Sequence, residues 1–599
     1  MTSVDSTSSK KDEDEEREIM HDLAEDEEHE DVSSELNAAQ QEYLAYNQQL
    51  EEFLSPMFLD EAVLYKLARR FSTTYRNLAL TSDQQFLPTP VTQLPTGRET
   101  GRYLAIDVGG SNLRVAFIEL LGEAVDSDVR PTDATERSRD TIRKAQRQRV
   151  KRTLERAWPI QEHLKMDKAE DLFSWIGDCI AEVVAESLSS DATKKDIPAE
   201  LDMGITFSFP IMQESLAEAT LMPTGKGFAI SSNLNLGNIL LNGYEKHTRR
   251  PDDEDEPSTK RRKLFALPKL KIQAITNDTV ATLASLAYKV KSLPNSRVAM
   301  GIIVGTGCNA TIPMKLSALH ESKAKSVNTM DPGAVETIVN TEWTISGAAP
   351  PLKELNVTTK WDVELDRACA RPGFQPFEYM TGGRYIGELI RLILIRLSHN
   401  NCRIIETLPT CKPPLNKSLP PPESSDWRWD ARAAGAFRKI ARAVQRRSAG
   451  LIAAAVVGLL ACAREIELKE DSNSSSPENP ASPQSNGDAI TESAGAPDAA
   501  AASLNSAAVA ANHAAQEHVV PVLDPTPIDW QSGPEELVVA YTGGIIQHYP
   551  QFKEMCQQYI DRLIMRTGPQ RGGKSVFLRE ASDGGVIGAG VLAGMVVRK

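Results

Sequence analysis

The stretch LAIDVGGSNLRVAFIEL, from Leu104 to Leu120, carries most of the fold prediction. Apolar residues lead up to Asp107, two glycines and two small polar residues follow, and a second β-branched run begins at Val115. This order predicts a strand, a tight turn and a returning strand. Taken alone, the stretch also fits an ordinary glycine-rich hairpin, because short motifs recur by chance.

The turn in this stretch has the composition of a phosphate-binding loop. Gly109 and Gly110 lack the Cβ atoms that would keep a phosphate away from the backbone. Ser111 and Asn112 add polar groups, and Asp107 at the strand end can hold a metal ion through water.

Two further segments repeat the order of strand, small-residue turn and polar residues. They are GIIVGTGCNAT, Gly301–Thr311, and LVVAYTGGIIQHYP, Leu537–Pro550. Before them, ITNDTVATLASLAY, Ile275–Tyr288, places Asp278 after an apolar strand and at the start of a helical run. Phosphate-type turns on both sides of an acidic strand end predict a split site for a nucleotide and an acceptor.

The composition is that of a soluble globular protein. The chain has 599 residues, 41% of them apolar and 25% charged, which allows two domains and a large core. Its net charge of −15 argues against general nucleic-acid binding. Residues Lys10–Asp31 are crowded with acids and lack the apolar run of a secretory signal, so a disordered tail is expected. The seven cysteines form no metal-ligand pattern, which favours a reducing compartment.

Several segments lie between the motifs and leave each motif intact. Leu451–Cys462 is apolar but too short to span a bilayer, so it predicts a buried helix. The expected insertions are Ala124–Pro159, with a basic helical stretch at Arg137–Arg156, then Arg250–Leu264, and Glu470–Pro527, whose composition predicts disorder.

A series of motifs follows in a fixed order from about Leu50 to the C-terminus. The motifs are DVGGSNLRV, TFSFP, GKGF, NDTVATL, GTGCNA, NTEW at Asn340–Trp343 and QPFEYMTGGRYIGEL at Gln375–Leu389. In this order they resemble the eukaryotic hexokinases and glucokinases, which belong to the sugar kinase, actin and Hsp70 fold group.

The resemblance implies an α/β, ribonuclease H-like fold with a cleft between a small and a large domain, and the alternation of strands and helical stretches predicts the same class. The chain is expected to begin with an acidic disordered tail at 1–40. The small domain is expected at 98–276, with the insertion 124–159 and a basic loop at 250–264, and a C-terminal helix at 586–599 returns to it. The large domain is expected at 41–97 and 277–585, with an N-terminal helix from about Glu42 to Phe71 and a disordered insertion at 470–527.

The implied reaction is phosphoryl transfer from ATP to the 6-hydroxyl of a hexose. Such a reaction needs a base near the attacking hydroxyl, and Asp278 matches the family's catalytic residue. Asp278 could also cap the helix that begins with TVATL, and the two roles are compatible. The neighbouring Asn277 is implied to bind a sugar hydroxyl.

The resemblance also implies the residues that hold the sugar and ATP. The sugar contacts are Ser208, Lys226, Asn277, Asn309, Glu342 and Glu378, although each alone also fits an ordinary strand-end, surface or loop residue. The nucleotide contacts are Asp107, Gly109, Gly110, Ser111, Asn112, Arg114, Thr306, Gly543 and Gly544. Mg²⁺ is expected to bridge the ATP phosphates and keep several waters, with no metal cage made by the protein alone.

Some positions depart from the family pattern, which predicts an altered sugar preference, weak use of ATP, or both. They are Ile211 and Met212 after TFSFP, Gly225 in place of a sugar-binding Thr, Thr344 in place of Gly, Thr542 in place of Asp in the adenosine turn, and Gly585 in place of Ser.

The leading function is an ATP-dependent hexokinase that acts on glucose or a related hexose and feeds glycolysis. The alternatives are an N-acetylglucosamine kinase of the same fold and a catalytically weak, sugar-sensing regulator. We expect a cytoplasmic protein with no membrane span and no nucleic-acid partner, and with regulatory proteins bound through the tails and insertions. The basic run Lys260–Lys263 fits either a nuclear import signal or a solvated loop.

Overall fold

The computed structural model describes residues 30–122, 149–161, 163–164, 168–190, 198–209, 211–222, 234–248, 266–290, 295–400, 431–470 and 535–597. The first part of the acidic tail, the basic loop and nearly all of the insertion predicted at 470–527 lie outside these residues. Disorder, nuclear import and partner binding by those segments therefore stay predictions.

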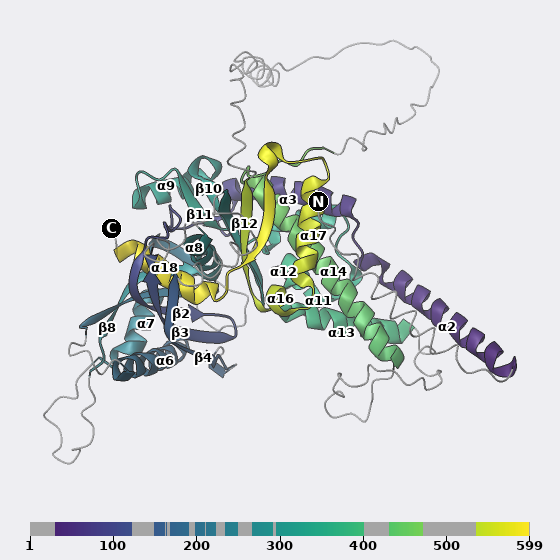
Figure 1. The fold of residues 1–599 in the computed structure, drawn as a ribbon, viewed down its shortest axis with the longest axis horizontal. Helices are drawn as coiled ribbons and strands as arrows, with labels where there is room; N and C mark the ends of the chain where they lie inside the picture. The colour runs from purple at the N-terminus through teal and green to yellow at the C-terminus, as the bar shows by residue number, and fades with distance from the viewer. Residues whose placement is uncertain are drawn as a thin grey trace, which may run out of the picture.

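Two mixed sheets flanked by helices confirm the α/β class (Figure 1). The larger sheet has the order β1-β11-β10-β9-β12-β13 and the smaller sheet the order β4-β3-β2-β5-β8. The larger sheet consists of β1 (Leu87–Pro88), β9 (Ser296–Val304), β10 (Cys308–Lys315), β11 (Glu336–Asn340), β12 (Glu536–Thr542) and β13 (Ser575–Glu580). The smaller sheet consists of β2 (Thr100–Val108), β3 (Asn112–Leu121), β4 (Val150–Pro159), β5 (Glu200–Phe207) and β8 (Lys269–Asn277), and β6 (Ile211–Ser215) and β7 (Glu218–Leu221) form a separate hairpin.

Both sheets share one strand arrangement. In the smaller sheet β2, β3 and β4 run antiparallel in sequence, and β5 and β8 continue parallel to β2. In the larger sheet β9, β10 and β11 run antiparallel, and β12 and β13 continue parallel to β9. The glycine turns of the first two motifs therefore occupy equivalent hairpins, β2–β3 and β9–β10.

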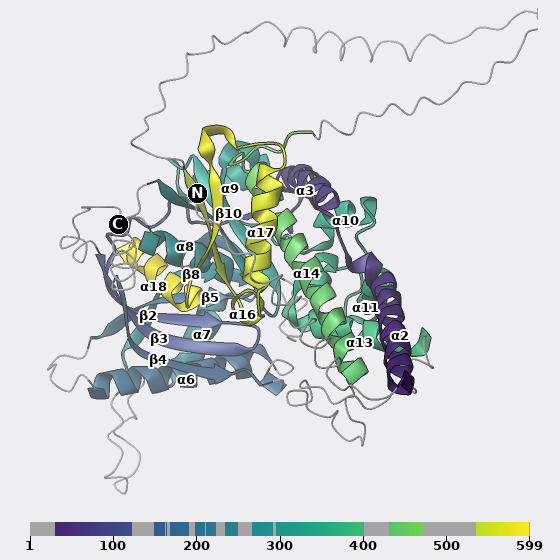
Figure 2. The ribbon, with the colours of Figure 1, turned by 45° about the vertical axis from the view of Figure 1, so that its right-hand side comes forward.

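The helices cover both faces of each sheet. They are α2 (Glu30–Leu54), α3 (Glu61–Thr81), α6 (Ala169–Ser190), α7 (Leu236–Glu245), α8 (Asp278–Val290), α9 (Glu321–Met330), α10 (Pro350–Glu354), α11 (Lys360–Ala368), α12 (Pro376–Thr381), α13 (Gly383–Asn400), α14 (Ala431–Cys462), α16 (Gly544–His548), α17 (Phe552–Met565) and α18 (Gly584–Val597). Helices α6 and α7 lie along the smaller sheet, and α3, α14 and α17 pack beside the larger one (Figure 2).

Helices α8 and α18 pack against each other between the two sheets (Figure 1). Helix α18 contacts β2, β3, β5 and β8, whereas α8 contacts β9, β10 and β12. Glycines permit this close packing: a Cβ atom at Gly588 would lie 2.1 Å from the carbonyl oxygen of Ala281, and one at Gly204 would lie 2.0 Å from that of Ala589. The backbones of α18, α8 and β5 are therefore in direct contact.

The apolar segment Leu451–Cys462 forms the end of α14, and the prediction of a buried helix is confirmed. Among the described helices, only the stretch Ala433–Cys462 is long and apolar enough to cross a membrane, and 94% of its most apolar window is buried inside the protein.

The predicted N-terminal helix from about Glu42 to Phe71 is wrong in its bounds. Helix α2 begins at Glu30, inside the segment 1–40 expected to be a tail, and a separate helix α3 begins at Glu61. Pro56 lies in the 3₁₀ turn between them and has no N–H group to continue a helix. Asp60 then caps α3 by accepting a 2.7 Å hydrogen bond from the amide of Val63.

The predicted basic helix at Arg137–Arg156 is also wrong over its last part. There β4 pairs with β3 at the edge of the smaller sheet, so residues 150–159 are part of the sheet and not of an insertion. Val150, Leu154 and Trp158 lie four residues apart, a spacing typical of one helix face.

A bulge in β4 explains this misleading spacing. The register shifts between Phe117 and Ile118 of β3, so Thr153 has no opposite residue in the strand register, although its hydroxyl donates to the Phe117 carbonyl at 3.4 Å. One extra residue moves the following side chains to the other face of the sheet. Val150 therefore packs with the cluster under α18, whereas Leu154 packs with the cluster under α6.

A buried ion pair joins α14 to α11. The Nη1 and Nη2 atoms of Arg447 donate to the two carboxylate oxygens of Asp362 at 2.7 and 2.6 Å, and the two side chains are 0% and 2% exposed. Asp362 also accepts 2.7 Å hydrogen bonds from the amide and the hydroxyl of Thr359, which caps α11. Each buried charge thus depends on the other for compensation.

We expect Arg447→Met to lower the free energy of unfolding by about 3–5 kcal/mol, because it leaves the carboxylate of Asp362 buried and uncompensated. Arg446→Met is the matched control, since the Arg446 side chain is exposed and donates to the Tyr559 hydroxyl. We expect this control to change the free energy by less than about 1 kcal/mol. Urea unfolding followed by circular dichroism compares the two variants, and equal losses would contradict the prediction.

Candidate functional site

Polar side chains gather where β2, β5 and β8 end. Asp107 near the end of β2 accepts a 2.8 Å hydrogen bond from the hydroxyl of Thr206 on β5. Ser208 follows β5, and its hydroxyl donates to Asp278 Oδ2 at 2.5 Å. Because these strands are parallel neighbours, their carboxyl ends meet at one edge of the sheet. Two acids and two hydroxyls therefore share one small region.

The cap of α8 separates the roles of Asn277 and Asp278. Asn277 Oδ1 accepts hydrogen bonds from the amide of Thr279 at 2.9 Å and from its hydroxyl at 2.5 Å. Asn277 therefore makes the helix cap that the sequence allowed for Asp278. The Asp278 carboxylate points instead toward Ser208. Asn277 is buried, and its side-chain nitrogen Nδ2 donates to the carbonyl oxygen of Phe209 at 3.4 Å.

A second polar cluster lies at the adjoining ends of β10 and β11 in the larger sheet. Asn309 Nδ2 donates to Asn340 Oδ1 at 2.9 Å and to Glu342 Oε1 at 3.1 Å, and Asn340 Nδ2 donates to the same Glu342 oxygen at 3.0 Å. The cluster brings together the predicted Asn309 and Glu342. Asn340 was missed as a site residue, although it is the first residue of the NTEW motif.

The backbone of Glu342 is held in an uncommon conformation. Its φ angle is 45°, in the left-handed region that glutamate rarely adopts. Its carbonyl oxygen accepts hydrogen bonds from Gln85 Nε2 at 2.9 Å and from the amide of Ile345 at 3.2 Å. These bonds and the two asparagines hold the carboxylate in one place, as in strained functional sites elsewhere.

Glu378 lies beside the glycine turn between β9 and β10. Its Oε2 atom accepts a 3.0 Å hydrogen bond from the amide of Cys308, and the residue is buried. A Cβ atom at Gly307 would lie 2.7 Å from this oxygen. The absence of a side chain at Gly307 thus makes room for the Glu378 carboxylate.

The first glycine turn offers backbone that a phosphate can approach. The Gly109 amide donates to the Asn112 carbonyl at 2.9 Å, which closes the turn. A Cβ atom at Gly110 would meet no described heavy atom within 4 Å, so the space above this residue is open. The side chains of Ser111 and Asn112 are exposed at the tip.

The second and third glycine turns lie back to back. Gly543 has a φ angle of 115°, and a Cβ atom there would lie 2.5 Å from the carbonyl of Val304. On the other side, the amides of Gly383 and Arg384 donate to the carbonyls of Gly305 and Thr306 at 2.7 and 3.0 Å. The Thr306 turn is therefore fixed between the β12–α16 and α12–α13 junctions, and Gly544 begins α16 beside it.

Asp107 lies against the first turn of α18. A Cβ atom at Gly585 would be 2.5 Å from Asp107 Oδ2, so a serine at 585 would require this carboxylate to move. Burial raises the pKa of Asp107 to about 6; the hydrogen bond from Thr206 opposes this rise and the nearby Asp278 carboxylate adds to it. Gly585 thus lets the Asp107 carboxylate lie directly against α18.

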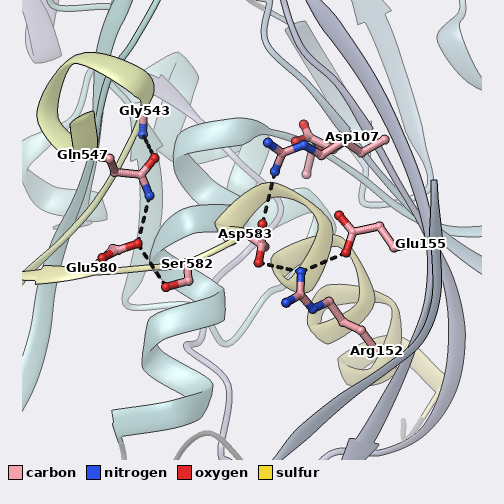
Figure 3. Close-up of polar contacts among 10 residues, drawn as sticks. Asp107, Arg152, Glu155, Gly543, Gln547, Glu580, Ser582 and Asp583 are labelled. Atoms are coloured by element: carbon pink, nitrogen blue, oxygen red, sulfur yellow. Dashed lines mark hydrogen bonds and ion pairs between the residues drawn. The ribbon is translucent and has the colours of Figure 1, made fainter. Parts of the chain in front are cut away.

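Figure 3 shows the charged residues around the start of α18. Arg114 Nη1 donates to Asp583 Oδ1 at 3.2 Å, and Arg152 Nη1 donates to Asp583 Oδ2 at 2.6 Å. A second chain of hydrogen bonds runs from the Gly543 amide to Gln547 Oε1, and from Gln547 Nε2 to Glu580 Oε1. The Gly543 turn is thereby connected to the segment that precedes α18.

Two of the sequence observations fall outside the described residues. Lys226 and the neighbouring Gly225 lie in the segment 223–233, so their placement stays a prediction.

Within the described part of the chain, no group of three or more His, Cys, Asp and Glu side chains is arranged to hold a metal ion. Besides Asn340, sequence reasoning missed Thr206 and Gln85, which touch the site through hydrogen bonds. Thr206 is the first residue of the TFSFP motif, whereas Gln85 lies in none of the motifs.

The comparison with known proteins agrees with the fold and the motif order. Two sequence models of the hexokinase family match the chain, one over residues 49–288 and the other over residues 299–482 and 489–595. A hexokinase of Schistosoma mansoni solved with glucose matches 92% of this chain and 98% of its own, with 21% identity and a TM-score of 0.59. This likeness confirms the predicted two-domain sugar kinase fold.

Curated relatives have related sequences over part of their length. A Schistosoma mansoni hexokinase is 33% identical over 53% of this chain and 56% of its own length. Hexokinase-1 of Schizosaccharomyces pombe is 29% identical over 58% of this chain and 60% of its own. Mouse hexokinase HKDC1 is 27% identical over 58% of this chain, which covers 32% of that relative. The matches thus span from about a third to three fifths of these relatives. The two family models, which together match most of the chain, show that it belongs to the hexokinase family.

Proposed function

We propose that this chain is an ATP-dependent hexose kinase that phosphorylates the 6-hydroxyl of glucose or a related hexose. The observation that carries the proposal is the position of Asp278. Its carboxylate accepts a hydrogen bond from Ser208, and it lies close enough to Asp107 to influence that residue's pKa. The proposed base thus lies between the region proposed for the sugar and the region proposed for the nucleotide.

In the proposed reaction, Asp278 accepts the proton of the attacking 6-hydroxyl while the new oxygen–phosphorus bond forms and the bond to the ADP leaving oxygen breaks. Ser208 donates to one carboxylate oxygen and so orients the other toward the substrate. Asn277 caps α8 and thereby fixes the backbone from which Asp278 projects.

Asn309, Asn340, Glu342 and Glu378 are proposed to bind the other sugar hydroxyls. Amide and carboxylate groups can each take part in paired hydrogen bonds with a polyol, and an unpaired group in such a site penalises a wrong sugar. Glu342 and Glu378 are buried at 8% and 3% exposure, which makes this penalty large.

The residues also fit a nucleotide with Mg²⁺. The open space above Gly110, the close backbone at Gly543 and the carboxylate of Asp107 suit phosphates and a hydrated cation. When bound, Mg²⁺ would neutralise charge on the transferring phosphoryl group. Asp107 would face the metal's water shell, and Thr206 would hold Asp107 in that orientation.

We expect Asp278→Asn to lower kcat by about 10²–10⁴-fold, because the base is lost while the shape of the side chain is kept. Sugar affinity should fall only a few-fold. A coupled ADP-release assay with glucose, mannose, fructose, glucosamine and N-acetylglucosamine measures turnover and preference, and titration calorimetry measures sugar binding. Asp171→Asn, an exposed acid in the first turn of α6, is the control and should change neither quantity. A variant at position 278 with turnover near that of the original chain would exclude Asp278 as the base.

We expect Asp107→Asn to stabilise the fold above about pH 6. A carboxyl whose folded pKa is raised binds its proton more tightly in the folded state, so stability is lost as pH rises from the unfolded pKa of about 4 through the folded pKa of about 6. Asparagine removes this loss. The free energy of unfolding of the asparagine variant, relative to the original chain, should therefore be higher at about pH 8 than at about pH 5 by about 1 kcal/mol. Urea unfolding at both pH values measures this, and an advantage that does not change with pH would contradict the argument.

A further inference from the structure

Arg152 reaches the nucleotide side of the site from β4, a strand that carries none of the motifs. Its guanidinium donates to Asp583 Oδ2 at 2.6 Å and to Glu155 Oε2 at 2.8 Å (Figure 3). Arg114, on the neighbouring strand β3, donates to the other oxygen of Asp583 at 3.2 Å. Two arginines from adjacent strands thus share one carboxylate.

The bulge in β4 places Arg152 there. Because Thr153 is the extra residue, Arg152 and Glu155 lie on the face of the smaller sheet that α18 covers. Arg156, beyond the bulge, lies on the opposite face and pairs with Glu186 of α6 at 2.7 Å. Without the bulge, Arg152 and Arg156 would share a face.

Asp583 is held where it meets both arginines. It has a φ angle of 54° and directly precedes α18. The segment before it is fixed because Glu580 Oε1 accepts hydrogen bonds from Ser582 Oγ and Gln547 Nε2, both at 3.1 Å. Lys289 of α8 lies close to the same charges: burial lowers its pKa to about 8, and Asp583 opposes this effect while Arg152 adds to it.

We propose that Arg152 and Arg114 form a pair that binds a phosphate group of the nucleotide, and that Asp583 occupies this pair as an internal competitor until the phosphate displaces it. Arginine binds carboxylate and phosphate through the same fork of N–H donors. The side chains of Arg114 and Arg152 are 40% and 44% exposed, so an anion from solvent can reach them. The pair adjoins Asp107 and the segment connected to Gly543, which lie on the nucleotide side.

This inference rests on the proposed kinase function, and ATP binding tests the two separately. Titration calorimetry of the full chain with ATP and Mg²⁺, and in parallel with adenosine, separates phosphate contacts from base contacts. Arg152→Ala should weaken ATP binding by about tenfold and leave adenosine binding unchanged. Arg156→Ala is the matched control, since it removes an equally exposed arginine from the same strand, and it should change neither.

Asp583→Asn tests the competitor. It keeps the shape of the side chain and removes its charge, so ATP should bind several-fold more tightly. Thermal melting checks that each variant is folded, and Arg152→Lys replaces Arg152→Ala if the alanine variant is not.

The outcomes are distinct. An Arg152→Ala variant that binds ATP like Arg156→Ala overturns the inference, and so does an Asp583→Asn variant that binds ATP more weakly than the original chain. An original chain that binds no ATP overturns the proposed kinase function instead.

Discussion

The contact between the backbones of α18, α8 and β5 is the constraint on which the rest of the structure depends. At Gly588 and Gly204 there is no room for even one side-chain carbon. The start of α8 bears Asp278, the end of β2 bears Asp107, and the segment before α18 bears Asp583. Helix α18 touches α8 and β5 through the main chain, and β5 is hydrogen-bonded to β2. Side-chain packing therefore cannot absorb a shift of one of these elements relative to the others. The distances among these acids are thus set by the fold itself.

The two sheets share one strand arrangement, so similar glycine motifs lie at equivalent turns but form different surfaces. Each sheet has a hairpin with a glycine turn, β2–β3 in the smaller sheet and β9–β10 in the larger one. In the smaller sheet the turn leaves open space at Gly110, whereas in the larger sheet the turn at Gly305–Gly307 is covered by α12, α13 and the Gly543 turn. One open turn and one covered turn give the two halves different surfaces from similar sequences.

The sequence predicted the features that depend on local order along the chain. The glycine turns, the strand before Asp278 and the buried end of α14 all follow from apolar runs and small residues in series. Features that depend on distant partners were missed. The strand β4 was read as a helix because its bulge is visible only against β3, and the cap at Asn277 depends on which of two neighbouring side chains turns toward Thr279. Gln85 reaches Glu342 from a distant loop, so no spacing in the sequence reveals it. Thr206 lies inside the TFSFP motif, but its hydrogen bond to Asp107 depends on the pairing of β5 with β2. The closeness of Gly585 to the Asp107 carboxylate likewise appears only in the folded chain.

Glu342 shows how stability and ligand chemistry can oppose each other at a single position. A left-handed glutamate costs of order 1 kcal/mol, and glycine would relieve that strain at once. Glycine would also remove the carboxylate that Asn309 and Asn340 bind. Laboratory evolution for heat resistance alone would therefore reward the loss of this side chain. Screens on this scaffold therefore need a selection for ligand binding as well as for stability. Without it, substitutions that stabilise the fold would accumulate in the site first.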